Sequence, residues 1–128
     1  MRLLLDTHIF LWAAGDQRRL KSKARSLIED TENVLFFSVA SLWELAIKGS
    51  GRRRGFRIDV RSLRRQLIDN GYFELPISGA HALGVLDLPP LHNDPFDRML
   101  IAQARVEGLT LLTADRQMAN YGEPVMRA

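Results

Sequence analysis

The chain has 128 residues, of which 46% are hydrophobic and 26% are charged, so it suits one globular domain over residues 1–128 rather than two. It contains no cysteine, which excludes disulfides, thiolate metal sites and a cysteine nucleophile. Any metal must then be held by carboxylates and the three histidines, a donor set that favours Mg²⁺ or Mn²⁺ over structural zinc. Eighteen Lys and Arg against fifteen Asp and Glu give a net charge of +3, which permits a polyanionic partner without requiring one.

The first half of the chain predicts two buried strands, each followed by a helix. Residues 3–5 are continuously apolar, as in a parallel strand, and a helix follows over residues 9–14. Residues 20–31 have a helical pattern, and residues 34–37 form a second apolar strand. Ser38 is placed to cap a helix whose apolar stripe consists of Val39, Leu42, Trp43, Ala46 and Ile47. We predict that Trp12 and Trp43 belong to the core.

The second half continues the alternation. We predict a helix capped by Asp59 and ending near Asn70, a strand over residues 72–75 and a short helix over residues 78–86. After the break at residues 89–90, Asp94 is a good N-cap, Pro95 suits the first helical position, and Gly108 ends that helix. A strand over residues 110–113, a short helix over residues 116–121 and a last strand over residues 124–126 complete the chain.

This alternation predicts an α/β fold with a mainly parallel sheet, in which all strands end at the same edge. Acidic residues gather where the chain reaches that edge. Asp6 and Asp115 each follow a strand, Asp97 lies in the first turn of the helix that Asp94 caps, and Glu44 lies in a helix after the second strand. We therefore expect these five carboxylates to converge, and their mutual repulsion favours a bound cation.

Structural interpretations of the same residues remain open. Asp94 and Asp97 are also what a helix N-terminus prefers, and Glu44 is spaced to form an ordinary surface ion pair with Lys48. We assign no role to His8 and His92, because carboxylate sites of this kind need no imidazole.

Asp6 and His8 interrupt the apolar N-terminal run, so we expect neither a signal peptide nor a membrane span. We therefore expect a cytoplasmic location.

Four segments together resemble the motifs of PIN-domain ribonucleases, and most closely those of the VapC toxins of bacterial toxin–antitoxin pairs. They are LLLDTH at residues 3–8, SLWELAIK at residues 41–48, HNDPFDRMLIAQA at residues 92–104 and LTADR at residues 112–116. Each motif is weak alone, but their order and spacing match the family over essentially the full chain.

The resemblance implies a PIN-like α/β/α sandwich, a homodimer, a cognate antitoxin that blocks the site, and endoribonuclease activity dependent on Mg²⁺ or Mn²⁺. Metal-activated water would hydrolyse the RNA phosphodiester bond. The matching acids are Asp6, Glu44, Asp97 and Asp115. Asp6 and Asp97 would ligate the metal directly, with Glu44, Asp94 and Asp115 as further candidates, and the hydroxyls of Thr7 and Thr113 would support the carboxylates or the substrate.

Two other classes of function fit the same residues. A non-catalytic regulatory module would bind a cation without cleaving RNA, although the complete set of acids disfavours this alternative. A related DNA nuclease would share the site chemistry, because recognition of the RNA 2′-OH depends on substrate contacts that the sequence does not display.

We predict that Arg52, Arg53 and Arg54 bind the RNA backbone, with Arg98 as a further candidate contact. Replacing residues 52–54 with Gln should weaken RNA binding and flatten its salt dependence, because fewer counterions are released on binding. Fluorescence anisotropy of a labelled RNA across a salt series measures both quantities. An unchanged slope would refute the assignment.

Overall fold

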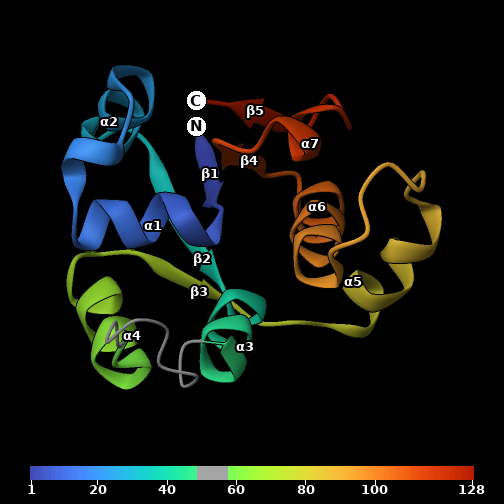
Figure 1. Ribbon diagram of the computed structural model, residues 1–128, viewed down its shortest axis with the longest axis horizontal. Helices are drawn as coiled ribbons and strands as arrows, with labels where there is room; N and C mark the ends of the chain where they lie inside the picture. Colours follow the sequence, from blue (N-terminus) through green and yellow to red (C-terminus); the bar gives the residue numbers. More distant parts are fainter. Residues whose placement is uncertain (49–57) are drawn as a thin grey trace.

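The computed structural model describes residues 1–48 and 58–128. Its centre is a parallel sheet in the order β3-β2-β1-β4-β5 (Figure 1). The strands are β1 (Arg2–Leu5), β2 (Val34–Ser38), β3 (Phe73–Leu75), β4 (Thr110–Thr113) and β5 (Val125–Arg127). The predicted strands are confirmed to within one residue at each end. The sheet order places β1 and β4 side by side at its centre, so the residues that follow these strands are neighbours in space.

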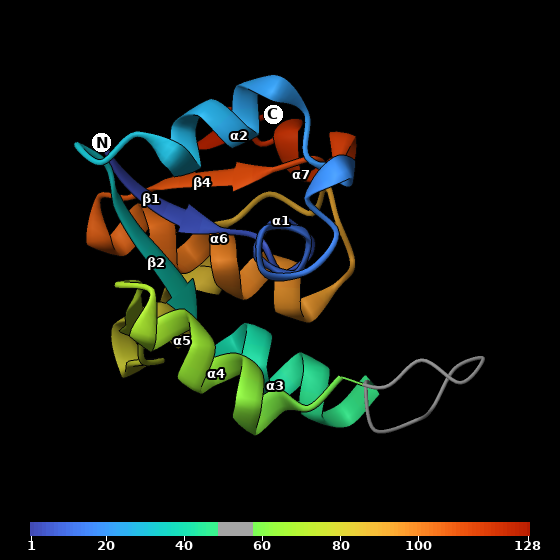
Figure 2. The same ribbon diagram turned by 90° about the vertical axis from the view of Figure 1, so that its left-hand side faces the viewer.

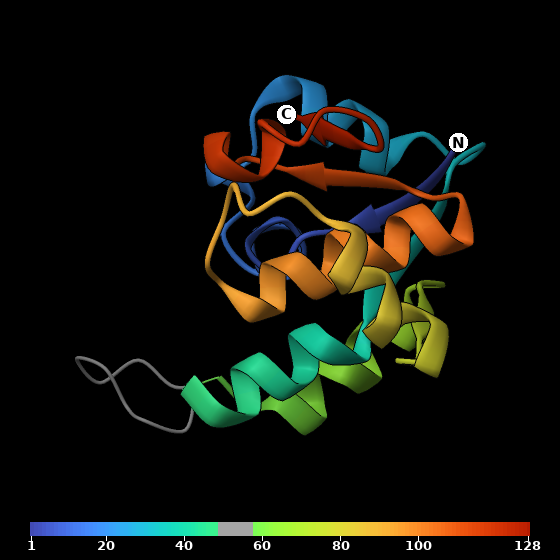
Figure 3. The ribbon, with the colours of Figure 1, turned by 90° about the vertical axis from the view of Figure 1, so that its right-hand side faces the viewer.

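Helices cover both faces of the sheet. One face carries α1 (Thr7–Ala14), α2 (Ser22–Glu29) and α4 (Val60–Asp69), as Figure 2 shows. The other carries α6 (Pro95–Glu107), with α5 (Gly79–Gly84) packed on it (Figure 3), and α7 (Arg116–Ala119). The α/β/α architecture expected from the sequence is confirmed. None of the helices in the described part of the chain is long and apolar enough to cross a membrane.

The core consists of two apolar clusters, one on each face of the sheet. Successive side chains of a strand point to opposite faces, so Leu3 and Leu5 of β1 join the cluster under α1, whereas Leu4 joins the cluster under α6. All three leucines are fully buried. The continuously apolar strands are therefore explained by helices on both sides, as predicted for a parallel sheet.

Helix α3 (Val39–Lys48) departs from its predicted packing. Its buried residues are Ala40, Ser41 and Leu45, whereas the side chain of Trp43 is 58% exposed and Ile47 is exposed too. The core assignment of Trp43 is therefore wrong. Helix α3 packs against α4 and α6. Ala40 lies in the apolar cluster under α6 and Leu45 in the cluster that contains α4 residues, while two large apolar side chains face outward. Trp43 instead meets the ring of Phe96 edge to face, with centroids 5.3 Å apart.

The start and end of α6 match the predicted signals. One oxygen of the Asp94 carboxylate accepts hydrogen bonds from the backbone N–H groups of Phe96 and Asp97, at 2.8 and 3.1 Å. Pro95 occupies the first turn, where its missing N–H costs nothing. Gly108 ends the helix with φ of +69°, a conformation that side chains with a Cβ rarely adopt. The cap thus fixes where the first turn of α6 begins.

A buried polar network holds the middle of α6. The Gln103 side chain is fully buried, accepts a hydrogen bond from the Ser38 hydroxyl and donates one to the carbonyl of Pro76. Beside it lies His81, whose Nδ1 accepts a hydrogen bond from the backbone N–H of Ser78. These bonds connect α6 to the end of β2 and to the segment before α5.

Replacing Gln103 with Leu should lower the free energy of unfolding by at least about 2 kcal/mol, because the Ser38 hydroxyl and the Pro76 carbonyl lose a partner in a buried place. Urea denaturation followed by circular dichroism measures this change. The exposed Gln66 of α4 provides the matched control, Gln66→Leu, which should change the free energy by less than about 0.5 kcal/mol. Equal values for the two variants would contradict a stabilising role for the network.

Candidate active site

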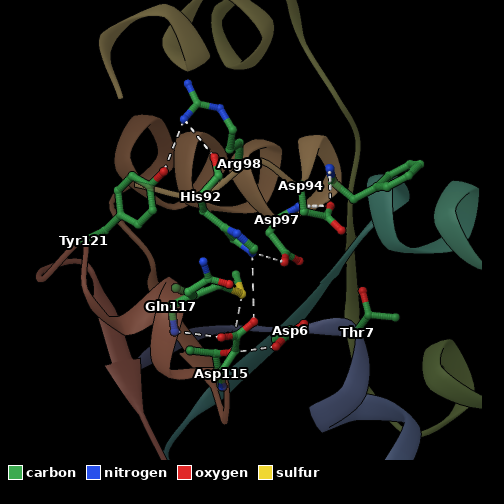
Figure 4. Close-up of polar contacts among 12 residues, drawn as sticks. Asp6, Thr7, His92, Asp94, Asp97, Arg98, Asp115, Gln117 and Tyr121 are labelled. Carbon is green, nitrogen blue, oxygen red and sulfur yellow. Dashed lines mark hydrogen bonds and ion pairs between the residues drawn. The ribbon is translucent and has the colours of Figure 1, made fainter. Parts of the chain in front are cut away.

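Three acidic residues meet at the carboxyl edge of the sheet. Asp6 follows β1, and Asp115 follows β4 and caps α7, its Oδ1 accepting from the backbone N–H of Gln117 at 2.7 Å. Asp97 lies in the first turn of α6. Because β1 and β4 are adjacent parallel strands, Asp6 and Asp115 end at the same edge, and α6 begins above it (Figure 4). The shared edge is what a parallel sheet predicts, and the adjacency of β1 and β4 comes from the observed strand order.

His92 completes the cluster. Its Nε2 lies 2.7 Å from Asp97 Oδ2 and 4.0 Å from Asp115 Oδ2. One ligand atom from each of these three residues lies within 4.8 Å of the others, so together they form a group that can hold a metal ion. Figure 4 shows the carboxylates of Asp6, Asp97 and Asp115 facing a common space below the imidazole. The donors there are carboxylate oxygens and one ring nitrogen.

Threonines hold two of the carboxylates. The Thr113 hydroxyl donates a hydrogen bond to Asp6 Oδ2 at 2.6 Å and accepts one from the backbone N–H of Asp115 at 3.0 Å. Both Asp6 and Thr113 are buried, so this bond is protected from water. The Thr7 hydroxyl lies 2.7 Å from the hydroxyl of Ser41 and 3.2 Å from Glu44 Oε1. Each of these threonines thus contacts a carboxylate of the proposed site.

Glu44 lies at the rim of the cluster, where both of its oxygens already have partners. Oε1 meets Thr7, and Oε2 accepts a hydrogen bond from Lys48 at 3.0 Å. The Lys48 ammonium also lies 3.9 Å from Asp94 Oδ2 and 5.3 Å from the centroid of the Phe96 ring. The ion pair predicted between Glu44 and Lys48 is present, and the lysine brings positive charge to the edge of an acidic site.

Asp94 and Arg98, two further predicted residues, have structural contacts. Asp94 caps α6 through Oδ1, as described above, and its Oδ2 faces Lys48. The Arg98 guanidinium donates hydrogen bonds to the backbone carbonyl of Val85 and to the hydroxyl of Tyr121, both at 3.2 Å. The arginines predicted to bind RNA at positions 52–54 lie outside the described residues.

A groove of about 760 Å³ begins beside Thr7 and Glu44. It runs between α1 and α3, and its lining includes Trp12, Arg19 and Lys48. Trp12 is partly buried and packs against the core from this position. The groove thus lies beside Glu44, at the rim of the acidic cluster, and carries two cationic side chains.

Crowding of the carboxylates changes their affinity for protons. Burial and the charges of Asp6 and Asp94 together raise the pKa of Asp97 to about 6, although the hydrogen bond from His92 opposes the rise. Burial also raises the pKa of Asp6, against the hydrogen bond from Thr113. The hydrogen bond to Glu44 raises the pKa of Lys48 and keeps that side chain charged. A cation near Asp6 and Asp97 would relieve the cost of ionising both.

His92 is the residue that sequence reasoning left without a role. Its side chain is 11% exposed and lies against Asp97, although the residues around it in the sequence show no helix or strand period. The only sequence feature that could have indicated a role is its position, two residues before the N-cap of a helix with an acid in its first turn. That spacing lets the chain fold over the N-terminal end of α6.

Comparison with known proteins gives the family. Residues 3–124 match the model of the PIN domain. Over 123 residues the chain is 29% identical to Ribonuclease VapC22 of Mycobacterium tuberculosis, covering 95% of this chain and 93% of VapC22. One similar fold is found in the crystal structure of VapBC2 from Rickettsia felis bound to a DNA fragment from their promoter. The TM-score is 0.72 at 17% sequence identity, and the match covers 100% of this chain and 98% of that chain. A toxin–antitoxin complex from Klebsiella pneumoniae gives 0.62 at 17% identity, with 97% and 95% covered. The protein belongs to the PIN-domain family.

Proposed function

We propose that this protein is a metal-dependent endoribonuclease that acts as the toxin of a toxin–antitoxin pair. The observation that carries the proposal is the cluster of His92, Asp97 and Asp115, whose ligand atoms lie close enough to hold a metal ion. The Asp6 carboxylate faces the same space at the edge of the sheet (Figure 4). The relative named Ribonuclease VapC22 supports the substrate class and the reaction. Hydrolysis of an RNA phosphodiester bond is the reaction that this arrangement suits best.

The residues present fit Mg²⁺ or Mn²⁺. Both ions prefer oxygen donors, and the cluster consists of carboxylates with one imidazole and no thiolate. Asp6 and Asp97 are our candidates for direct ligands, with Asp115 next to them and Glu44 and Asp94 nearer the rim. When bound, the ion would lower the pKa of water and offset negative charge on a phosphoryl group.

The chain's own residues have distinct tasks in this proposal. The Thr113 hydroxyl orients the Asp6 carboxylate, and the His92 imidazole orients that of Asp97. The Lys48 ammonium donates a hydrogen bond to Glu44 and holds that carboxylate at the rim of the cluster. The same positive charge would attract a phosphate of the RNA strand. The groove that begins beside Thr7 is our candidate path for a single RNA strand, whose nucleotides can lie splayed in an open channel.

The proposed partners follow from the relatives. A solved relative is a toxin–antitoxin complex, which supports a cognate antitoxin that covers the acidic site. We also propose a homodimer, as the VapC resemblance implies, and RNA as the substrate, which places the action in the cytoplasm. The net charge of +3 assists binding of RNA, since a basic chain attracts a phosphate backbone.

The substitution Asp97→Asn should abolish RNA cleavage while leaving the fold intact, because the amide keeps the shape of the side chain but offers no anionic oxygen to a cation. Total cellular RNA incubated with the purified protein and Mg²⁺ or Mn²⁺ should give discrete fragments, which EDTA or the substitution removes. Asp69→Asn, at the exposed end of α4, serves as the matched control and should cleave like the wild type.

Metal-dependent cleavage by Asp97→Asn would refute the assignment of Asp97. Single-stranded DNA in a parallel reaction separates the ribonuclease from a DNA nuclease. Metal binding by antitoxin-free wild-type protein without any cleavage of RNA or DNA would favour the non-catalytic module instead.

The raised pKa of Asp97 predicts how pH affects stability. With a folded-state pKa of about 6 against about 3.9 in an unfolded chain, the folded protein binds an extra proton between those values. The contribution of Asp97 to the stability of the metal-free protein should therefore be fully present below about pH 4 and be lost, by up to about 3 kcal/mol, as the pH rises through 6. Asp97→Asn should reduce this fall, and the remainder reflects Asp6, whose pKa is also raised.

Urea denaturation in EDTA at pH 4.5, 5.5, 6.5 and 7.5 tests this linkage for the wild type and the Asp97→Asn variant. Saturating Mg²⁺ at pH 7.5 should restore stability to the wild type much more than to the variant. Parallel pH profiles for the two proteins would contradict the origin of the effect in Asp97.

A further inference from the structure

The segment before α6 has little regular structure of its own, yet it delivers His92 to the acidic cluster. After the 3₁₀ turn Val85–Asp87, the consecutive prolines Pro89 and Pro90 lack N–H groups, so they cannot contribute to a helix or strand ladder. Within the turns of this segment, the backbone N–H of Leu88 bonds to the carbonyl of Val85, and that of Leu91 bonds to the carbonyl of Pro89. The carbonyl groups of this segment also accept hydrogen bonds from a side chain outside it.

Arg98 supplies them from the first turns of α6. Its Nη2 donates to the carbonyl of Val85 at 3.2 Å, and its Nη1 lies 3.2 Å from the carbonyl of Pro89 and 3.5 Å from that of His92. The same Nη1 also meets the Tyr121 hydroxyl at 3.2 Å (Figure 4). One guanidinium thus contacts both ends of the segment 85–92.

This geometry differs from that of an arginine that binds a phosphate. A phosphate-binding guanidinium offers its forked N–H groups to the ligand, whereas here both terminal nitrogens are already engaged by backbone carbonyls and Tyr121. The Arg98 side chain also points away from the acidic cluster, on the far side of the His92 backbone (Figure 4). Its effect on the cluster must pass through the segment that it holds.

We propose that Arg98 is a positioning residue of the metal site: it holds residues 85–92 against α6, and this places the imidazole of His92 on Asp97 and beside Asp115. The inference rests on the proposed function only in taking Asp97 as a metal ligand. With ionised Asp97, the Nε2–H of His92 donates to Oδ2 and fixes how the carboxylate faces the site. Arg98 and Asp97 are adjacent on α6, so the same turn of helix carries the ligand and the residue that secures its orientation.

The test uses the full-length metal-free protein and three arginine variants. Arg98→Met removes the hydrogen bonds, and Arg105→Met removes an exposed arginine from the last turn of the same helix. Arg98→Lys keeps the charge but has one terminal nitrogen in place of two, so it loses the forked contact with the carbonyls of Val85 and Pro89. The chain has three histidines, so assigned imidazole ¹⁵N signals report on His92, with the buried His81 and the exposed His8 as internal references.

Both Arg98 variants should move the His92 signals toward those of a freely exposed imidazole, while the His81 signals stay in place. They should also weaken Mn²⁺ binding, followed by electron paramagnetic resonance without RNA, by about tenfold, the lower end of what residues behind metal ligands contribute. His92→Gln should weaken Mn²⁺ binding in the same direction, and Arg105→Met should match the wild type in both measurements.

Several results would overturn the proposal. One is an unmoved His92 signal in Arg98→Met, and another is a displaced His92 with Mn²⁺ affinity equal to that of the wild type. A phosphate contact would appear as normal His92 signals together with a salt slope of RNA binding reduced by about 0.7, measured on uncleaved RNA in the Asp97→Asn background, and with recovery in Arg98→Lys.

If Arg98→Met fails to fold, Tyr121→Phe removes one partner of the guanidinium and must shift the His92 signals in the same direction, or the proposal is wrong. Absence of Mn²⁺ binding by the wild type would count against the proposed function. The placement of His92 by Arg98 would then still be decided by the imidazole signals of the metal-free variants.

Discussion

Repulsion among carboxylates at one edge of the sheet is the constraint on which the rest of the site depends. Burial opposes the ionisation of both Asp6 and Asp97, and the neighbouring carboxylates add to this cost: Glu44 for Asp6, and Asp6 with Asp94 for Asp97. The protein keeps them there by directional bonds: Thr113 on Asp6 and His92 on Asp97. An acidic site of this kind stores unfavourable free energy that a bound cation releases, which joins metal affinity to the stability of the fold.

The sheet topology makes this concentration of charge possible without long loops. Asp6 and Asp115 need only follow two adjacent parallel strands, and the cap at Asp94 sets where the first turn of α6 presents Asp97. Short connections of this kind leave little conformational freedom near the reacting groups. Positively charged groups enter from other elements, as Lys48 does from the last turn of α3.

Sequence reasoning recovered the fold and the meeting of Asp6, Asp97 and Asp115 because both depend on local signals. Of the other two acids expected there, Glu44 lies at the rim and Asp94 caps α6. Apolar runs indicate buried strands, and the Asp94–Pro95 pair is a strong helix start. It failed at Trp43, since the apolar stripe of α3 does not reveal which of its residues face α4 and α6 and which face outward. It also gave no role to His92 and did not reveal the contacts of Arg98 with backbone carbonyls before α6, because contacts made across an irregular segment have no periodic signature. Such contacts depend on tertiary structure alone.

The buried amide of Gln103 has a consequence for the precision of the site. An apolar contact between a helix and a sheet changes little in free energy when the helix slides by a fraction of an ångström, whereas hydrogen bonds to Ser38 and Pro76 are directional. Gln103 lies six residues after Asp97, about 9 Å along the axis of α6. The hydrogen bonds of Gln103 therefore fix the position of α6 along its axis, and with it the distance of the Asp97 carboxylate from the ends of the strands.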